Sequence, residues 1–390
     1  MGRERRIGIW LVGCRGSVAT TVVAGVSALG RELVPPVGCV TELPPFRRLQ
    51  LPAFADIVFG GHDIVDTPLL KRAEGLVGSG VLPPHLLGQI ADELAAAERE
   101  MRPGPAAGPG AAPQGRAADG IILDLTSFRR RHDLDTVVVV NVSSTEAAVA
   151  DSPAFATLDA LRQALDERPD VLPPSSLYAY AAFSAGCPFI DFTPSTGARL
   201  PALAQLARTA GVPYAGRDGK TGETLVKSVL APMFACRALQ VRAWSGTNLL
   251  GGGDGAALDH PEAALSKSDS KQRVLTDVLG PSVEGTTHID NVPALGEWKT
   301  AWDHIRFDGF LGTAMTMQFI WQGCDSALAA PLVLDLARLV SVAHRAGWVG
   351  PLPPLGFFFK DPDGDGDQAL DTQYRALLDW VDGLAPQLHS

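Results

Sequence analysis

Cysteine is sparse and unpatterned in this chain of 390 residues. No two of its five cysteines have the spacing of a CxxC motif; they are Cys14, Cys39, Cys187, Cys236 and Cys324. Disulfide frameworks and zinc sites both need paired or closely spaced cysteines. We therefore expect neither, and we predict a protein of the reducing cytoplasm without a bound metal.

An excess of positive charge is also absent. The 33 Lys and Arg residues are outnumbered by 43 Asp and Glu residues, and the formal net charge is −10. Nucleic-acid binding depends on basic surfaces that neutralise phosphates, so we do not expect it here. No apolar run reaches the roughly 18 residues of a membrane span, and the first residues show no secretory cleavage pattern. We expect no membrane association.

Lysine is scarce and unevenly placed. Only seven of the 33 basic residues are Lys, and six of these lie beyond residue 219: Lys220, Lys227, Lys267, Lys271, Lys299 and Lys360. A buried lysine can lose its proton and act as an acid or base, whereas arginine stays charged. The distribution indicates titratable amines gathered for chemistry, although solvated lysines placed by chance are the alternative.

Two glycine-rich loops lie among these lysines. Residues 216–224 (GRDGKTGET) precede an apolar helical pattern, and residues 248–255 (NLLGGGDG) precede a lysine-bearing segment at 266–271. Backbone N–H groups in such loops, together with the partial positive charge of a helix N-terminus, bind anions. The sequence therefore predicts a site for a phosphorylated small molecule.

The first residues have the order strand, glycine turn and helix. The apolar run 6–12 is followed by Gly13, Arg15, Gly16, Ser17 and Val18, and residues 20–29 suit a helix. This order places a dinucleotide pyrophosphate on a helix N-terminus. The match to GxGxxG is imperfect, so an ordinary strand–helix turn remains the alternative.

Further strands are predicted at 38–41, 57–59, 135–142, 177–182 and 189–192. They alternate with helical segments, which predicts a doubly wound parallel sheet. Ligands bind at the carboxyl ends of such strands, where this sequence has polar residues: Glu42, Asp63, Asn141, Ser143, Thr145 and Asp191. Glu42 or Asp63 could hold a ribose, and either could instead cap a helix.

The pattern changes beyond the lysine-rich centre. Strands are predicted at 241–248, 287–292 and 313–321 without long helices between them, which indicates a second, partly antiparallel layer. The apolar residues of that layer suit subunit packing. A strong helical pattern at 326–344 is expected to return the chain to the first domain.

Taken in order, these motifs resemble those of the myo-inositol-1-phosphate synthase family. The resemblance covers essentially the whole chain and rests on six segments: 216–227, 248–255, 266–271, 295–299, 324–326 and 358–360. It implies an α/β fold with an NAD-binding, Rossmann-like domain at 1–224 and 329–390. It also implies an inserted α+β domain at 225–328 that carries catalysis and assembles a homotetramer.

The resemblance implies an isomerase that cyclises D-glucose 6-phosphate to 1L-myo-inositol 1-phosphate. In this family the sugar is oxidised, enolised, closed by an intramolecular aldol step and reduced again, so NAD is regenerated within each turnover. Lys267 would exchange a proton at the carbinol oxygen, and Lys360 would stabilise the enolate or aldolate oxygen. Lys271 and Lys299 would hold the phosphate.

The residues expected at the site form three groups. The catalytic group is Lys267, Lys271, Lys299, Lys360, Asp218, Asp254 and Asp325. The cofactor group is Gly13, Arg15, Gly16, Ser17, Val18, Glu42, Asp63, Asn141, Ser143, Thr145 and Asp191. The substrate-phosphate group is Lys220, Thr221, Gly222, Glu223, Thr224 and Asn248.

Several positions depart from the larger eukaryotic members of the family. Gly252 and Gly253 replace two asparagines, and Glu297 and Trp298 precede Lys299 where those members carry Asp-Ser. Two other functions therefore stay open. One is cyclisation of another sugar phosphate, such as fructose 6-phosphate, to a five-membered cyclitol phosphate. The other is a dinucleotide-binding sensor without turnover.

Overall fold

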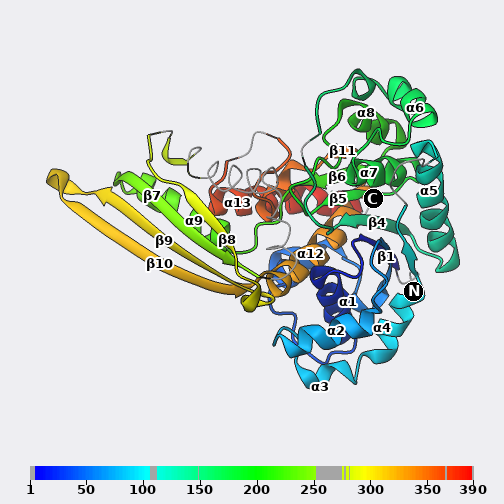
Figure 1. Cartoon of the computed structure of the whole chain (residues 1–390), viewed down its shortest axis with the longest axis horizontal. Helices are drawn as coiled ribbons and strands as arrows, with labels where there is room; N and C mark the ends of the chain where they lie inside the picture. Colours follow the sequence, from blue (N-terminus) through cyan, green and yellow to red (C-terminus); the bar gives the residue numbers. More distant parts are fainter. Residues whose placement is uncertain are drawn as a thin grey trace.

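The chain folds around two β-sheets, seen in the computed structural model in Figure 1. The structure describes residues 5–105, 112–147, 149–251, 275, 278–280, 282–364 and 367–388. One sheet has seven strands and is enclosed by helices. The other has four strands and extends away from the first as a long arm.

All strands of the seven-stranded sheet run parallel, in the order β11-β6-β5-β4-β1-β2-β3. Their bounds are β1 Ile7–Val12, β2 Ile57–Asp63, β3 Met101–Pro103, β4 Thr136–Asn141, β5 Phe189–Asp191, β6 Pro213–Gly216 and β11 Gly350–Pro351. The predicted doubly wound α/β fold is confirmed. The strand order reverses between β1 and β4, and such a reversal opens a ligand crevice at the carboxyl ends.

Helices cover both faces of this sheet. They are α1 Ser17–Gly30, α2 Leu69–Gly78, α3 Pro84–Leu87, α4 Ala91–Glu98, α5 Gln114–Arg131, α6 Leu158–Glu167, α7 Pro174–Ser184, α8 Pro201–Ala210, α12 Asp325–Arg345 and α13 Leu370–Leu384. Along β1, Ile9 and Leu11 enter the core beneath α1 and α12, whereas Trp10 and Val12 enter the core beneath α5 and α7. Two buried faces explain why the strands read as unbroken apolar runs.

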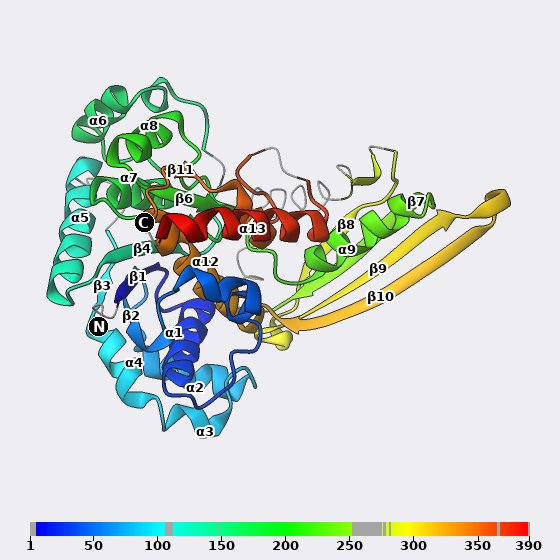
Figure 2. The same ribbon diagram turned by 180° about the vertical axis from the view of Figure 1, so that it is seen from behind.

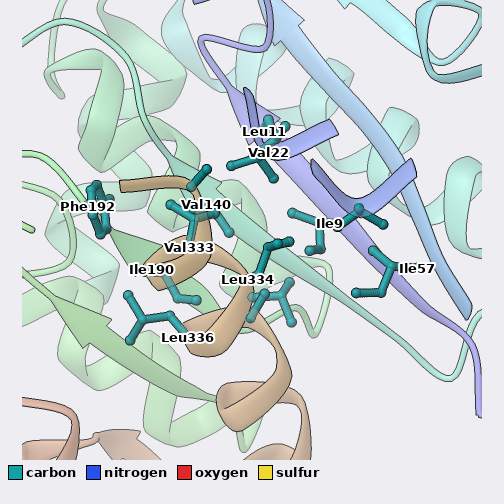
Figure 3. Packing of buried hydrophobic residues seen from close by; sticks show 14 of the residues in the cluster. Ile9, Leu11, Val22, Ile57, Val140, Ile190, Phe192, Val333, Leu334 and Leu336 are labelled. Carbon is teal, nitrogen blue, oxygen red and sulfur yellow. The ribbon is translucent and has the colours of Figure 1, made fainter. Parts of the chain in front are cut away.

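Helix α12 is the central core helix. Val333, Leu334 and Leu336 pack near Ile9 and Ile190 of the sheet (Figure 3). By length and composition α12 could cross a membrane, but 78% of its most apolar window is buried within the protein. Its apolar character therefore belongs to the core, and the helix predicted at 326–344 is confirmed.

The four-stranded sheet has the order β10-β9-β7-β8, with β7 parallel to β8 and antiparallel to β9. The bounds are β7 Gln240–Leu250, β8 Thr287–Asn291, β9 Trp298–Asp308 and β10 Ala314–Cys324. Helix α9 (Glu223–Cys236) covers one face through Phe234, which packs on Trp244 and Phe307. The predicted partly antiparallel layer is confirmed, although its strand β9 was not anticipated.

Two predicted strands are wrong. Residues 38–41 run into a 3-10 helix, η1 (Val40–Glu42), because the N–H groups of Val40 and Thr41 donate to the Asp335 carboxylate of α12 instead of to a strand. Residues 177–182 lie inside α7. Nearly every side chain of α7 is buried, so the sequence lacks the polar face by which helices are recognised.

A buried ion cluster of Lys227, Glu223 and Asp303 connects α9 with the strands of the arm. Lys227 is fully buried, with its Nζ 2.5 Å from Glu223 Oε1, 3.7 Å from Asp303 Oδ1 and in a 3.3 Å hydrogen bond to Thr287 Oγ1. Trp244 Nε1 donates to Asp303 at 2.7 Å. Burial, and then the neighbouring Glu223 charge, raise the pKa of Asp303 to about 6. One amine thus stabilises two buried carboxyl groups.

We predict that Lys227→Met destabilises the protein by about 3–5 kcal/mol, because it leaves buried carboxylates without their cation. Denaturant unfolding followed by tryptophan fluorescence measures the loss. Lys71→Met is the matched control, since Lys71 pairs with Glu74 on the surface. Equal stability of the two variants would contradict the assignment.

Candidate active site

A cavity of about 130 Å³ lies at the carboxyl ends of β1, β4, β5 and β6, where the arm joins the seven-stranded sheet. Its lining comes from both parts: Val18, Val142, Ser143, Thr145, Phe192, Thr193, Pro194, Asp218, Gly219, Thr221, Leu250, Ile289, Lys299, Asp325, Ala329 and Lys360. The lining combines charged and hydroxyl side chains with apolar ones. Such a cavity can hold a small polar molecule in a partly water-excluded setting.

The glycine turn after β1 forms one side of the site. Gly13 has φ +82°, and a Cβ there would lie 2.8 Å from Ser143 Cα, so only glycine fits. Gly16 is the N-cap of α1, without a side-chain cap bond and with no acidic residue in the first helical turn. These features fit the pyrophosphate of a dinucleotide. Ser17 Oγ donates to Glu297 Oε1 at 2.7 Å, so the arm also reaches this turn.

Of the two carboxylates considered for the ribose, only Asp63 lies at a strand end beside the glycine turn. It ends β2 and accepts a 2.7 Å hydrogen bond from the Arg15 N–H. The Arg15 guanidinium in turn pairs with Glu98. Glu42 lies in η1 instead of at a strand end, and it accepts a 2.6 Å bond from Arg338 of α12.

Asn141 and Asp191 form a buried network under the cavity. Asn141 Nδ2 donates to Asp191 Oδ1 at 3.1 Å, and the Thr193 hydroxyl donates to the same oxygen at 2.7 Å. Burial raises the pKa of Asp191 to about 7. Neither residue lines the cavity, whereas Ser143 and Thr193 beside them do. Their hydrogen bonds support Thr193 beside the cavity, and their contact with the cofactor stays a prediction.

Two lysine–carboxylate pairs line the cavity. Lys299 Nζ of β9 lies 2.7 Å from Asp325 Oδ2, and Lys360 Nζ lies 2.7 Å from Asp218 Oδ1. Thr221 Oγ1 donates to Asp325 Oδ1 at 3.2 Å. Burial alone would raise the pKa of Asp325, but the charge and hydrogen bond of Lys299, with Lys360 nearby, outweigh it and lower the pKa. Four predicted catalytic residues thus meet from separate segments.

The other three predicted catalytic residues are Asp254, Lys267 and Lys271. They lie outside the residues that the structure describes. Their contribution to the site remains a prediction from the sequence.

An NAD-binding family model described as myo-inositol-1-phosphate synthase matches residues 7–381. Inositol-3-phosphate synthase 1 of Bacteroides thetaiotaomicron is 33% identical over 409 residues, covering 95% of this chain and 94% of that protein. The chain belongs to the myo-inositol-1-phosphate synthase family. Inositol-3-phosphate synthase of Drosophila melanogaster is 31% identical and covers 99% of this chain and 74% of its own length.

Solved structures confirm the fold of this family member. Inositol-3-phosphate synthase from Caenorhabditis elegans superposes with a TM-score of 0.86 at 23% identity, covering 98% of this chain and 86% of that chain. A myo-inositol-1-phosphate synthase-related protein from Thermotoga maritima gives 0.75 at 23% identity, covering 97% and 99%.

Of the six residues predicted to bind phosphate, Thr221 alone is among the residues that line the cavity, and phosphate contact by the other five stays a prediction. Glu223 and Thr224 begin α9 and are buried, with Glu223 paired to Lys227, and Asn248 is buried in β7. Gly222 is the N-cap of α9 and has no side chain to contribute. Thr221 lines the cavity, so the turn before α9 stays the candidate phosphate site with backbone N–H groups as donors.

Lys220 is also buried and does not line the cavity, so its phosphate contact stays a prediction. Its side chain is 3% exposed and hydrogen-bonds Gln373 Oε1 of α13, while its N–H donates to the Phe358 carbonyl. Burial, and then the charge of Lys360, lower the pKa of Lys220 to about 7. Figure 2 shows α13 extending toward the arm beside this region.

The apolar residues that line the cavity were not identified from the sequence. Leu250 ends β7, Ile289 lies within β8 and Phe192 directly follows β5, and all three read as ordinary core residues. A Cβ at Gly219 would lie 2.1 Å from Phe192 Cζ, so glycine is needed where these two segments touch. No spacing in the sequence signals that contact, because it joins β5 and β6 through their loops.

We predict that the stability of the wild type rises relative to Lys220→Met as the pH increases from 6 to 9. The folded-state pKa of about 7 lies below the ordinary 10.5, so above pH 7 the unfolded chain holds one proton more than the folded chain. Each pH unit in this window then favours the folded wild type by up to about 1.4 kcal/mol. Urea unfolding at both pH values measures the change.

Lys71→Met is the control, because a surface lysine keeps its proton throughout this window in both states. A constant stability difference between wild type and Lys220→Met across the range would show that the Lys220 amine does not titrate there.

Proposed function

We propose that this chain is an NAD-dependent isomerase that cyclises D-glucose 6-phosphate to 1L-myo-inositol 1-phosphate. The observation that carries the proposal is the meeting of the pairs Lys299–Asp325 and Lys360–Asp218 in one cavity beside the glycine turn. Family membership and the names of the relatives, inositol-3-phosphate synthases, support the same reaction.

The proposed division of labour follows from the chemistry of the lining residues. Bound NAD would supply reversible hydride transfer at the sugar. Lys360 is half-buried, and its charged amine stabilises the oxyanion that develops at the enolate or aldolate stage. Lys299 and the turn at Thr221 hold the phosphate, and Asp218 and Asp325 orient the two amines. Lys267 exchanges the proton at the carbinol oxygen, and Lys271 assists with the phosphate.

Residues of the glycine turn and the strand ends hold the dinucleotide in this proposal. Gly13, Gly16 and the first turn of α1 cradle the pyrophosphate, and Asp63 lies where a ribose hydroxyl would bind. Val142, Phe192 and Ile289 exclude water beside the amines. A drier cavity strengthens the attraction between an ammonium group and a developing oxyanion. All five cysteines are unpaired, which suits a cytoplasmic enzyme.

The purified protein should convert glucose 6-phosphate to inositol 1-phosphate with catalytic NAD and without net release of NADH. Product NMR and the reduced-nicotinamide absorbance measure both features. Lys360→Met should lower kcat at least about 100-fold, because it removes the stabilising cation, whereas Lys71→Met should not change it.

Three outcomes would overturn this proposal. A cyclitol formed only from fructose 6-phosphate would identify the second sugar-phosphate reaction. Dinucleotide binding without any cyclisation would identify the sensor. Steady accumulation of NADH would identify a simple dehydrogenase.

We also propose that a homotetramer forms through the arm. Trp302 of β9 and Ile320 of β10 lie directly opposite each other on the face of the sheet away from α9, and Ile320 is 72% exposed. Phe310 and Leu311 protrude at the far tip of the arm in the turn η7 (Phe310–Gly312). Large apolar side chains exposed on a sheet face, here Trp302 and Ile320 among polar residues, favour an interface, and a second copy of the chain is the occupant we propose.

Ile320→Glu should convert the proposed tetramer to a smaller species, because it places a charge in an apolar interface. Size-exclusion chromatography with light scattering measures the mass. Val37→Glu is the control, since Val37 is an exposed apolar residue (83%) outside the arm. A wild-type monomer would contradict the proposal directly.

A further inference from the structure

Lys360 lies on a segment that is hydrogen-bonded through its backbone to the loop after β6. The Lys220 N–H donates to the Phe358 carbonyl at 2.8 Å, and the Lys360 N–H donates to the Asp218 carbonyl at 2.7 Å. Arg217 and Asp361 exchange backbone hydrogen bonds of 2.9 and 3.2 Å. The two segments therefore form a short antiparallel ladder outside the main sheet.

Alternation along this ladder separates two kinds of side chain. Asp218 and Lys360 face each other and line the cavity. Arg217 and Asp361, one position away on each segment, do not line it. Their side chains instead pair with each other, since Arg217 Nε donates to Asp361 Oδ2 at 2.9 Å.

Arg217 also binds the loop after β5, which contributes Pro194 to the cavity lining. Its Nη1 donates to the carbonyl oxygens of Pro194 and Ser195, each at 3.0 Å. Pro194 lines the cavity, so one guanidinium connects the loop after β5 with the segment that carries Lys360. Lysine cannot reproduce these three bonds, because its single ammonium group lacks the planar fork.

A second arginine completes the arrangement. Arg199 Nη1 donates to Asp361 Oδ2 at 2.8 Å, its Nη2 to the Asp361 carbonyl at 2.7 Å and its Nε to Asp363 Oδ1 at 2.9 Å. The Asp361 side chain is only 11% exposed and accepts from both guanidinium groups. Charge-assisted bonds of this kind fix geometry more strongly than neutral ones.

We propose that Arg217, acting through Asp361, is a positioning residue that holds Lys360 against Asp218 and at a set distance from the wall of the cavity at Pro194. Only the expected loss of kcat rests on the proposed function. Loss of Arg217 should displace the Lys360 amine whatever reaction takes place at this cavity. Misplacing a catalytic group by about 1 Å can slow a reaction about 100-fold.

The kinetic test compares the wild type with Arg217→Met, Arg217→Lys, Asp361→Asn and the double variant Arg217→Met/Asp361→Asn. We expect Arg217→Met to lower kcat about 10- to 100-fold while NAD affinity and the KM for glucose 6-phosphate change less than about 3-fold. Enzyme-bound reduced nicotinamide should accumulate, because ring closure needs Lys360 and the preceding oxidation does not. Arg217→Lys should fail to restore kcat.

The double variant tests whether Arg217 and Asp361 act as a unit. If they do, its loss of kcat should be about that of the worse single variant instead of the product of the two losses. Arg208→Met is the matched control, because Arg208 is an exposed arginine in the last turn of α8. It should retain wild-type kcat.

A crystal structure of Arg217→Met gives a readout independent of activity. We expect the distance from Lys360 Nζ to Asp218 Oδ1 to lengthen from 2.7 Å to more than about 4 Å, beyond ion-pair contact. An unchanged distance, wild-type kcat, multiplicative losses or a loss explained by weaker NAD binding would each overturn the inference. A wild type that cyclises no sugar phosphate would overturn the proposed function, and the distance would still decide the positioning role.

Discussion

The cavity depends on the pairing of each half-buried amine with a carboxylate that comes from a different segment. An ammonium group withdrawn from water loses hydration, and an adjacent carboxylate restores the charged form. Lys299 reaches Asp325 from β9, and Lys360 reaches Asp218 from the loop before α13. The Lys299–Asp325 pair therefore forms only when the arm and the seven-stranded sheet are assembled together, and the Lys360–Asp218 pair forms only when the segments after β6 and β11 meet.

Helix α12 connects this chemistry to the stability of the fold. Its first residue is Asp325, whose carboxylate binds Lys299 and Thr221, and its later turns fill the core beneath β1, β4 and β5. Asp335 in the same helix holds the N–H groups of η1. A single rigid helix therefore fixes a cavity residue with the precision of core packing. Gly13 likewise fixes the site through close packing, because it lets the turn after β1 approach Ser143.

Much of this could be predicted from the sequence, and the failures have physical causes. The buried run at β4 and the glycine turn indicate the parallel sheet, and the scarcity of lysine alone singles out Lys299 and Lys360. Lys220 belonged to the same set but is turned to Gln373, because residue type does not say which way a side chain points. Glu223 looked like part of an anion-binding turn, whereas its partner is Lys227 one helical turn later. The sequence pattern does not predict helix α7 or the apolar residues that line the cavity, since tertiary packing alone determines them.

The balance of charge among the described cavity-lining residues bears on how the proposed substrate would bind. Among the cavity-lining residues that the structure describes, Lys299 and Lys360 are matched by Asp325 and Asp218, so the amines and carboxylates cancel. A phosphate monoester brings a charge of roughly −1.5 to −2 near neutral pH, and an N-terminal helix turn offsets only about half a charge. Lys220 is directed away and loses its proton near pH 7. In the proposed function the phosphate therefore calls for positive charge beyond these residues, and Lys267 and Lys271, which precede β8 in the sequence, are the lysines of this half of the chain proposed to supply it.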